Sequence, residues 1–298
     1  MPQALGSKHV SFRNVLLATD FKPSAHAALL HALGLARRYG ARVFMVHVVN
    51  PAGQRLLGQE AVERATTGAW RQAQTTMTNL LIEGRLEGIE YETLVKTGDV
   101  WQELSKVITE FDIDLLVTGT RGRSGVWKML LGSTAEVVFR QAPCPVLTVG
   151  PRLTSPVPSP EGPKRILYCT GFAPHSLAAG EFAVSLAEQQ GATLALLHVV
   201  SGAATESAQT QEEIRAQAQE SLKALIPTEG LSSNEPEVFV GSGDVPTVIV
   251  ETAERWNADL IVLGLRRADQ DPRGTRWSTA YSVVSNAPCP VLTIRTPE

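Results

Sequence analysis

The sequence has few cysteines, few aromatic residues and no long apolar run. Its three cysteines, Cys144, Cys169 and Cys289, lack C-x-x-C spacing, which argues against a disulfide framework or a zinc site and favours buried, reduced thiols. No segment approaches the roughly 20 consecutive apolar residues that span a bilayer, and the first residues lack the apolar core of a secretory signal. We therefore expect a cytoplasmic protein that does not enter a membrane.

Neither positive nor negative charge dominates the sequence. The formal net charge is -3, and the 27 basic and 30 acidic residues are interspersed, so no basic stripe is available for nucleic acid or anionic lipid. The sequence contains no Walker A motif, no kinase HRD and DFG pair and no nucleophile elbow. Its six histidines form no HExxH or HxxxH pattern, so no metal site is predicted.

An internal repeat divides the chain into two halves. The segment APCPVLT at Ala142 to Thr148 recurs 145 residues later, and Thr19-Asp20-Phe21 corresponds to Thr170-Gly171-Phe172 at a separation of 151. Between the copies, Pro151 to Pro163 contains five prolines and reads as a semi-extended linker. We therefore expect domains at residues 1–150 and 164–298, joined by a linker at 151–163.

Each half alternates short apolar runs with longer amphipathic ones, which predicts an α/β fold. The strands expected in the first half are Val15 to Ala18, Arg42 to Val49, Glu90 to Lys96, Leu115 to Thr118 and Pro145 to Val149. The expected helices are Ser24 to Tyr39, Ala61 to Leu86, Trp101 to Phe111 and Ser133 to Gln141. This order indicates two Rossmann-like, doubly wound domains, each with a five-stranded parallel sheet. Ligands of such sheets bind beyond the carboxyl ends of the strands, here after strands one, two and four.

The loop after the fourth strand carries the strongest motif. Gly119, Gly122, Gly132 and Ser133 fit the spacing G-x2-G-x9-G-S, and Thr134 follows. Glycines let a ligand approach the backbone, while the free N–H groups at the start of a helix and two hydroxyls favour an anion such as a phosphate chain. The alternative is that Ser133 and Glu136 form only a capping box and that the glycines only make turns.

On this motif the chain resembles the universal stress protein family, in the subgroup that binds ATP, over nearly its whole length as two copies. The resemblance implies flavodoxin-like domains and an ATP site in the first of them. Asp20 would receive the adenine or ribose, with helix capping as its alternative role. The resemblance also implies the other nucleotide contacts: Ala18, Thr19 and the backbone of Val48 line the base pocket; Gly119, Gly122, Gly132, Ser133 and Thr134 hold the ribose and phosphates; and Thr118, Thr120, Arg121 and Arg123 lie nearby.

The second half departs from this pattern. Gly171 replaces Asp20, Arg267 replaces Gly122 and Trp277 replaces Gly132, while the counterparts of three motif positions persist as Gly264, Ser278 and Thr279. We therefore expect a degenerate scaffold there, although Arg266, Arg267, Arg273 and Arg276 offer an alternative anion site. The paired histidines His47 and His198 are expected to be structural, and Trp127 and Trp277 to anchor loops.

The leading functional hypothesis is a non-catalytic, ATP-binding regulatory module whose signalling partner is unknown, with Mg²⁺ admitted beside the phosphates. One alternative is a slow ATPase or phosphotransferase, for which Asp20 and Asp99 are the only candidate carboxylates. Another is a structural dimerisation protein without a ligand. By family likeness, Pro145 to Val149 would pair with Pro290 to Ile294 in an internal pseudo-dimer, and two such chains would form a homodimer.

Overall fold

The computed structural model describes residues 4–6, 9–21, 25–50, 58–120, 138, 141–154, 159, 161–201, 208–227, 235–265 and 277–295 of the chain. The chain divides into two compact units. The first domain comprises Ser11–Pro151 with Pro156–Pro160, and the second comprises Glu161–Glu298 with Met1–Val10 and Arg152–Ser155. The described residues among the first ten, 4–6 and 9–10, therefore group with the second repeat.

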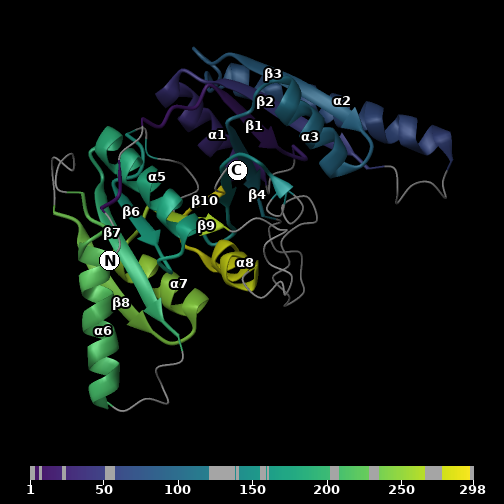
Figure 1. The fold of residues 1–298 in the computed structure, drawn as a ribbon. Coiled ribbons are helices and arrows are strands. Elements are labelled where there is room, and N and C mark those ends of the chain that lie inside the picture. The colour runs from purple at the N-terminus through teal and green to yellow at the C-terminus, as the bar shows by residue number, and fades with distance from the viewer. Residues whose placement is uncertain are drawn as a thin grey trace. The chain divides into compact units, whose positions relative to one another are not determined.

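The first domain is a doubly wound α/β unit, as the sequence predicted (Figure 1). Its strand order is β3-β2-β1-β4-β5, and the neighbouring strands pair in parallel. The winding reverses between β1 and β4, which places the carboxyl ends of these two strands side by side. The elements are β1 (Asn14–Ala18), α1 (His26–Tyr39), β2 (Arg42–Val49), α2 (Gln59–Ile82), β3 (Tyr91–Thr97), α3 (Val100–Glu110), β4 (Leu115–Gly119) and β5 (Val146–Val149).

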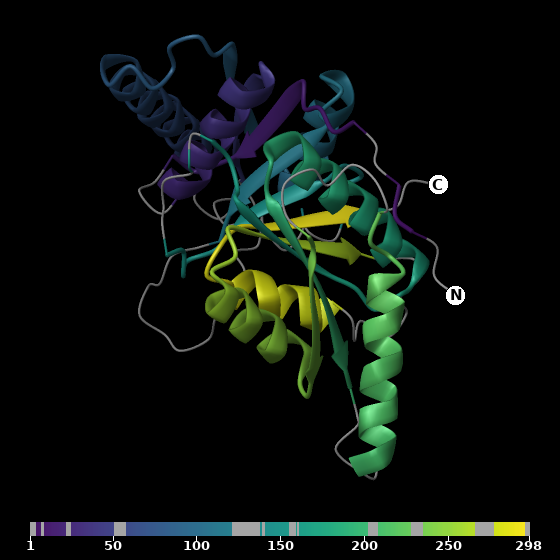
Figure 2. The ribbon, with the colours of Figure 1, turned by 90° about the vertical axis from the view of Figure 1, so that its left-hand side faces the viewer.

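The second domain repeats this topology, with the strand order β10-β9-β6-β7-β8 and parallel pairing. Figure 2 shows α7 and α8, in yellow-green and yellow, on one face of its sheet, with α5 and α6, in green tones, on the other. The elements are β6 (Arg165–Cys169), α5 (Pro174–Gln190), β7 (Thr193–Val200), α6 (Ala208–Lys223), β8 (Glu237–Ser242), α7 (Val245–Trp256), β9 (Leu260–Leu265), α8 (Trp277–Asn286) and β10 (Val291–Arg295).

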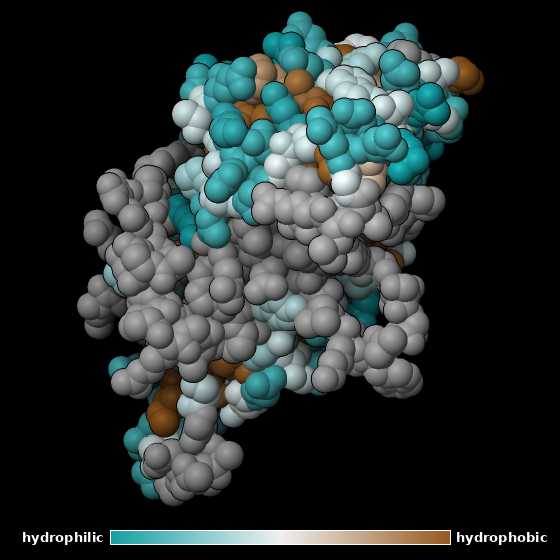
Figure 3. Space-filling view, turned by 90° about the vertical axis from the view of Figure 1, so that its right-hand side faces the viewer, coloured by the Kyte–Doolittle hydropathy of each residue, from teal (hydrophilic) through white to brown (hydrophobic). Residues whose placement is uncertain are grey.

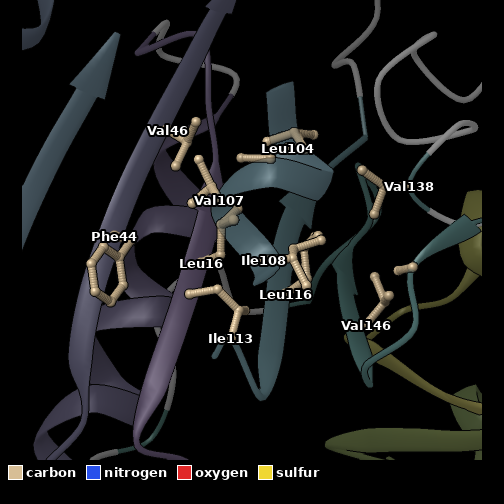
Figure 4. Packing of buried hydrophobic residues seen from close by; sticks show 12 residues of the cluster. Leu16, Phe44, Val46, Leu104, Val107, Ile108, Ile113, Leu116, Val138 and Val146 are labelled. Atoms are coloured by element: carbon tan, nitrogen blue, oxygen red, sulfur yellow. The ribbon is translucent and has the colours of Figure 1, made fainter. Parts of the chain in front are cut away.

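Apolar side chains from the strands of the sheet and from α3 form a hydrophobic core cluster of the first domain (Figure 4). Leu16 and Leu116 of the central strands are fully buried and meet Leu104, Val107 and Ile108, which share one face of α3. Because helices cover a parallel sheet on both sides, its central strands are apolar throughout and do not alternate. These strands therefore form a rigid base for the loops at their carboxyl ends.

A repeated aspartate joins the central strands of each domain. Asp114, just before β4, accepts hydrogen bonds from the backbone N–H groups of Arg13 (2.7 Å) and Asn14 (3.2 Å) at the start of β1. Asp259 accepts the corresponding bonds from Lys164 and Arg165 at 2.9 and 3.0 Å. The aspartates that open the repeated DLLVTG and DLIVLG segments thus have a structural role.

The N-terminal segment is bound to the second domain by hydrogen bonds and apolar packing. The N–H of Leu5 donates to the carbonyl oxygen of Leu225 at 3.0 Å, and the side chain of Leu5 is buried. A methyl group added at Gly180 of α5 would lie 2.7 Å from Leu5 and 2.8 Å from the phenol of Tyr168. Gly180 therefore leaves the space that these two side chains fill.

The surface in Figure 3 is mostly hydrophilic over the described residues, with hydrophobic residues in scattered groups. Two large apolar side chains of α2, Trp70 and Ile82, are exposed. This helix ends at Ile82, four residues earlier than the sequence predicted, because the chain then turns through Gly84 with a φ of 66°. Within the described ranges, no helix is long and apolar enough to span a membrane.

Candidate functional site

The described candidate residues of the first domain gather at the carboxyl ends of β1, β2 and β4. Ala18 at the end of β1 is in register with Thr118 of β4 on one side and with Val46 of β2 on the other. Asp20 is half-buried and lies two residues beyond β1. The structure thus brings Ala18, Thr19, Asp20, Val48, Thr118, Gly119 and Thr120 to one edge of the sheet.

A hydrogen-bonded turn positions Asp20. Thr19 donates its N–H to Val46 at 3.0 Å and accepts, through Oγ1, the N–H of Phe21 at 3.0 Å. Phe21 has a φ of 55°, the left-handed region that a bulky residue rarely adopts. His47 Nδ1 lies 2.9 Å from the carbonyl oxygen of Thr19, so this nitrogen carries the proton and donates. The residues on either side of Asp20 are therefore fixed by the fold.

The second domain contains the same turn without the aspartate. Phe172 has a φ of 60° and donates its N–H to Thr170 Oγ1 at 3.0 Å, and His198 Nδ1 donates to the carbonyl oxygen of Thr170 at 2.9 Å. Since both histidines tie the end of the second strand to the turn after the first, the structural role expected for them agrees with their contacts. Gly171 is exposed at the position of Asp20.

The two threonines at the end of β4 bond to the backbone. Thr120 donates its N–H (3.0 Å) and its hydroxyl (3.4 Å) to the carbonyl oxygen of Val149, and Thr118 Oγ1 donates to the carbonyl oxygen of Gly119 at 3.4 Å. Both side chains are buried. Their hydroxyl protons therefore already have acceptors within the sheet.

The glycine that ends β4 recurs one residue before the end of β9, where it has a packing role. A Cβ atom at Gly264 would lie 2.3 Å from the carbonyl oxygen of His175 and 2.6 Å from Cα of Ser176, both in the first turn of α5. Glycine is needed there so that helix and strand can approach closely. Gly119 is its counterpart in the first domain, so we expect the same packing role there beside the nucleotide contact inferred from the motif.

Asp99, a candidate for holding a metal, caps a helix. Its Oδ1 accepts the N–H of Gln102 at 3.0 Å, and Asp244 of the second domain accepts the N–H of Thr247 at 3.2 Å. Both aspartates precede a helix and satisfy one of its free N–H groups. The repeated Gly-Asp-Val segment is explained by this capping without any ligand.

The remaining motif residues lie outside the described part of the chain: Arg121, Gly122, Arg123, Trp127, Gly132, Ser133 and Thr134 in the first repeat, and Arg266, Arg267, Arg273 and Arg276 in the second. Of Trp277 and Ser278, only the helical backbone is described. Their assignments therefore stay predictions.

A cavity of about 390 Å³ opens in the second domain, at the place that corresponds to the candidate site of the first. It lies at the carboxyl ends of β6, β7 and β9 and is bounded by residues that include Thr170, Leu197, His198 and Leu263. The sequence predicted only a degenerate scaffold here. The cavity was missed because its walls come from three strands that are far apart in the chain.

The cysteines have the inert character expected from the sequence. Burial raises the pKa of the Cys144 and Cys289 thiols to about 12, and it raises the pKa of Cys169 as well. All three are free thiols, and their raised pKa values keep them protonated at neutral pH. Among the residues that the structure describes, no group of three or more histidines, cysteines or acidic residues is placed to hold a metal ion.

The fold agrees with a comparison against family models, in which the universal stress protein family matches residues 11–150 and 162–295. The chain belongs to the universal stress protein family. Its two halves are universal stress protein domains in tandem, which confirms the family and the tandem arrangement expected from the sequence.

Single universal stress proteins match one half of the chain. One from Thermus aquaticus is 32% identical over 139 residues, which cover 46% of this chain and 98% of the relative. Another, from Methanocaldococcus jannaschii, is 26% identical over 146 residues, covering 46% of this chain and 82% of the relative. Each relative thus corresponds to about one domain.

Solved structures of tandem length share the fold. A universal stress protein from Archaeoglobus fulgidus superposes with a TM-score of 0.68 and 22% identity, covering 95% of this chain and 98% of its own. A functionally unknown protein from Pseudomonas aeruginosa gives a TM-score of 0.64 and 17% identity, covering 95% and 92%. At these identities the likeness extends to the fold alone.

Proposed function

We propose that this universal stress protein is an ATP-binding regulatory module in which only the first domain holds the nucleotide. The observation that carries the proposal is the position of Asp20, which lies beyond β1 beside the end of β4, where the G-x2-G-x9-G-S motif begins at Gly119. A carboxylate at this point of a doubly wound sheet is placed for ribose hydroxyls or an exocyclic amine. The second domain has Gly171 instead.

The described residues fit such a ligand. The turn around Thr19 holds Asp20 at the carboxyl edge of the sheet, and Val48 is half-buried near the end of β2. The phosphates of ATP would bind to the loop that contains Gly122, Gly132 and Ser133, and Mg²⁺ would bind beside the phosphates. Nucleotide occupancy would then set a conformation or the choice of a signalling partner.

A slow ATPase or phosphotransferase is the alternative. It would need a carboxylate that holds a metal and a group that orients water near the γ-phosphate. Since Asp99 caps α3, Asp20 is the remaining named candidate. Turnover of saturating ATP and Mg²⁺ under steady-state conditions separates the two functions, and the proposal expects none above background. A cytoplasmic location, the internal pseudo-dimer and homodimerisation stay predictions from the sequence.

Substitution of Asp20 tests the proposal. Asp20→Ala should raise the Kd for ATP roughly 10- to 150-fold, which corresponds to the loss of about 1.5–3 kcal/mol from hydrogen bonds to a charged group. Asp99→Ala is the matched control, because it removes a capping carboxylate of the same domain and should lower its stability without changing the Kd. Unchanged ATP affinity in a folded Asp20→Ala protein would contradict the proposal.

A further inference from the structure

The cavity of the second domain has the size and walls of a small-molecule site. Its volume of about 390 Å³ falls within the roughly 300–1,000 Å³ of typical ligand pockets. Apolar side chains from both strands and helices bound it, among them Leu197 of β7, Ile249 of α7 and Leu263 of β9. An apolar ligand would therefore exchange water for hydrocarbon contacts.

The described walls of this cavity contain no permanently charged side chain to attract a phosphate. Its described lining includes no lysine, arginine, aspartate or glutamate, and Gly171 stands where the first domain has Asp20. The start of α5 also offers few amides, because Pro174 has no N–H and the N–H of Ser176 donates to Ala173 at 2.8 Å. An uncharged ligand suits this lining better than a nucleotide.

Two hydroxyl groups and one imidazole in the cavity wall present acceptors. Thr170 Oγ1 donates to Ser176 Oγ at 3.1 Å, and Ser176 Oγ donates to the carbonyl oxygen of Ala173 at 2.7 Å, so both hydroxyl protons are used. His198 donates from Nδ1 to the carbonyl oxygen of Thr170, so Nε2 is the ring nitrogen left to accept a hydrogen bond. A ligand that carries one N–H or O–H donor would match these groups.

The imidazole of His198 is held in place before any ligand binds. The ring of Phe172 lies 4.5 Å from it between centroids, at an interplanar angle of 34°. Phe172 is itself fixed by its bond to Thr170, and the floor at Ser176 is braced by Tyr168, whose hydroxyl donates to the carbonyl oxygen of Ser176 at 2.6 Å. Such preorganisation lowers the entropic cost of binding.

We propose that the second domain binds an uncharged, largely apolar small molecule that donates one hydrogen bond to His198. The site is separate from the proposed nucleotide site of the first domain and differs from it in ligand chemistry. Whether ATP binds the first domain does not affect this assignment, so the two proposals can fail independently.

Indole is a suitable probe, since it is neutral and has a single N–H donor. Titration of the full chain, followed by ligand-observed NMR at pH 8, should show one indole site per chain. 1-Methylindole lacks the donor and should bind about 5-fold more weakly, the scale of one neutral hydrogen bond. Indole-3-carboxylate, which is an anion, should bind at least 10-fold more weakly, and ATP should not displace indole.

Two variants fill the cavity from its mouth. Gly171 is exposed and a Cβ atom there would meet nothing within 4 Å, so Gly171→Trp should fold and abolish indole binding. Ser201→Trp, at the exposed end of the cavity beyond β7, should do the same. Glu254→Trp, on the exposed side of α7 and outside the cavity lining, is the control and should bind indole normally.

The proposal is overturned if wild-type protein does not bind indole, if both cavity-filling variants bind it as wild type does, or if ATP displaces it. Equal binding of indole and indole-3-carboxylate would also overturn it, because the cavity would then not select against charge. Binding that either cavity-filling variant abolishes and Glu254→Trp keeps supports it.

Discussion

Replacement of Gly264 by alanine should destabilise the second domain strongly. The added methyl group would lie 2.3 Å from the carbonyl oxygen of His175, 2.6 Å from Cα of Ser176 and 2.8 Å from the carbonyl carbon of His175. All three atoms belong to the backbone, so no side chain can rotate away. Strand β9 is paired on both sides, with β6 and β10, which prevents it from moving.

The expected cost follows from this geometry. Overpacking a core typically costs about 1–3 kcal/mol, and contacts with backbone alone place Gly264→Ala at the upper end, about 3 kcal/mol. Gly171→Ala is the matched control, because its methyl group meets nothing within 4 Å. That change should be neutral or stabilise the domain by up to about 1 kcal/mol through the unfolded state.

Hydrogen exchange of peptides from β9 and α5, recorded at increasing urea concentrations, measures the stability of the second domain separately from that of the first. With a denaturant slope of about 2 kcal/mol per M, a loss of 3 kcal/mol lowers the midpoint by about 1.5 M. If Gly264→Ala unfolds at the same urea concentration as Gly171→Ala, then β9 and α5 do not approach each other as closely as the structure shows. The structural explanation of the repeated glycine would then fail.

Two further predictions concern buried side chains. Burial lowers the pKa of His31 to about 4, so the unfolded chain binds a proton below pH 6.5 that the folded chain does not. The free energy of unfolding of the first domain should therefore fall by up to about 3 kcal/mol as the pH falls from 6.5 to 4. His31→Phe, which introduces the residue found at Phe182 of the second repeat, should make the free energy of unfolding measured in urea less dependent on pH. Leu5→Ala should destabilise the second domain by about 2 kcal/mol and speed amide exchange at Leu5, whereas an unchanged exchange rate would show that the N-terminal segment is not bound.

The elements of the fold were predictable because each has a local signature. Strand β2 was predicted and found at Arg42–Val49, since a continuous apolar run bounded by turns reads as a buried strand. The end of α2 was not predictable to the residue, because the helix stops where Gly84 adopts a left-handed conformation, although Leu86 continues the apolar pattern. The association of the first residues with the second domain depends on tertiary packing around Leu5 and had no local signal.

The candidate site was only partly predictable, because the sequence does not separate ligand contacts from fold contacts. A comparison of the two repeats would have helped. Asp99, His47 and Gly119 all have counterparts in the half that lacks the full motif, and the structure gives those counterparts, Asp244, His198 and Gly264, roles in capping or packing. Asp20 has no such counterpart, which strengthens its assignment to a ligand.

The number of ATP molecules that bind to one chain tests the central claim most directly. Calorimetric titration of the full chain with ATP and Mg²⁺ should give one site, because only the first domain combines Asp20 with the complete glycine motif. The same titration of Gly132→Trp should give none, since an indole side chain would exclude phosphate from the start of the helix. Two equivalent sites in the wild-type chain, or unchanged binding in Gly132→Trp, would contradict the account.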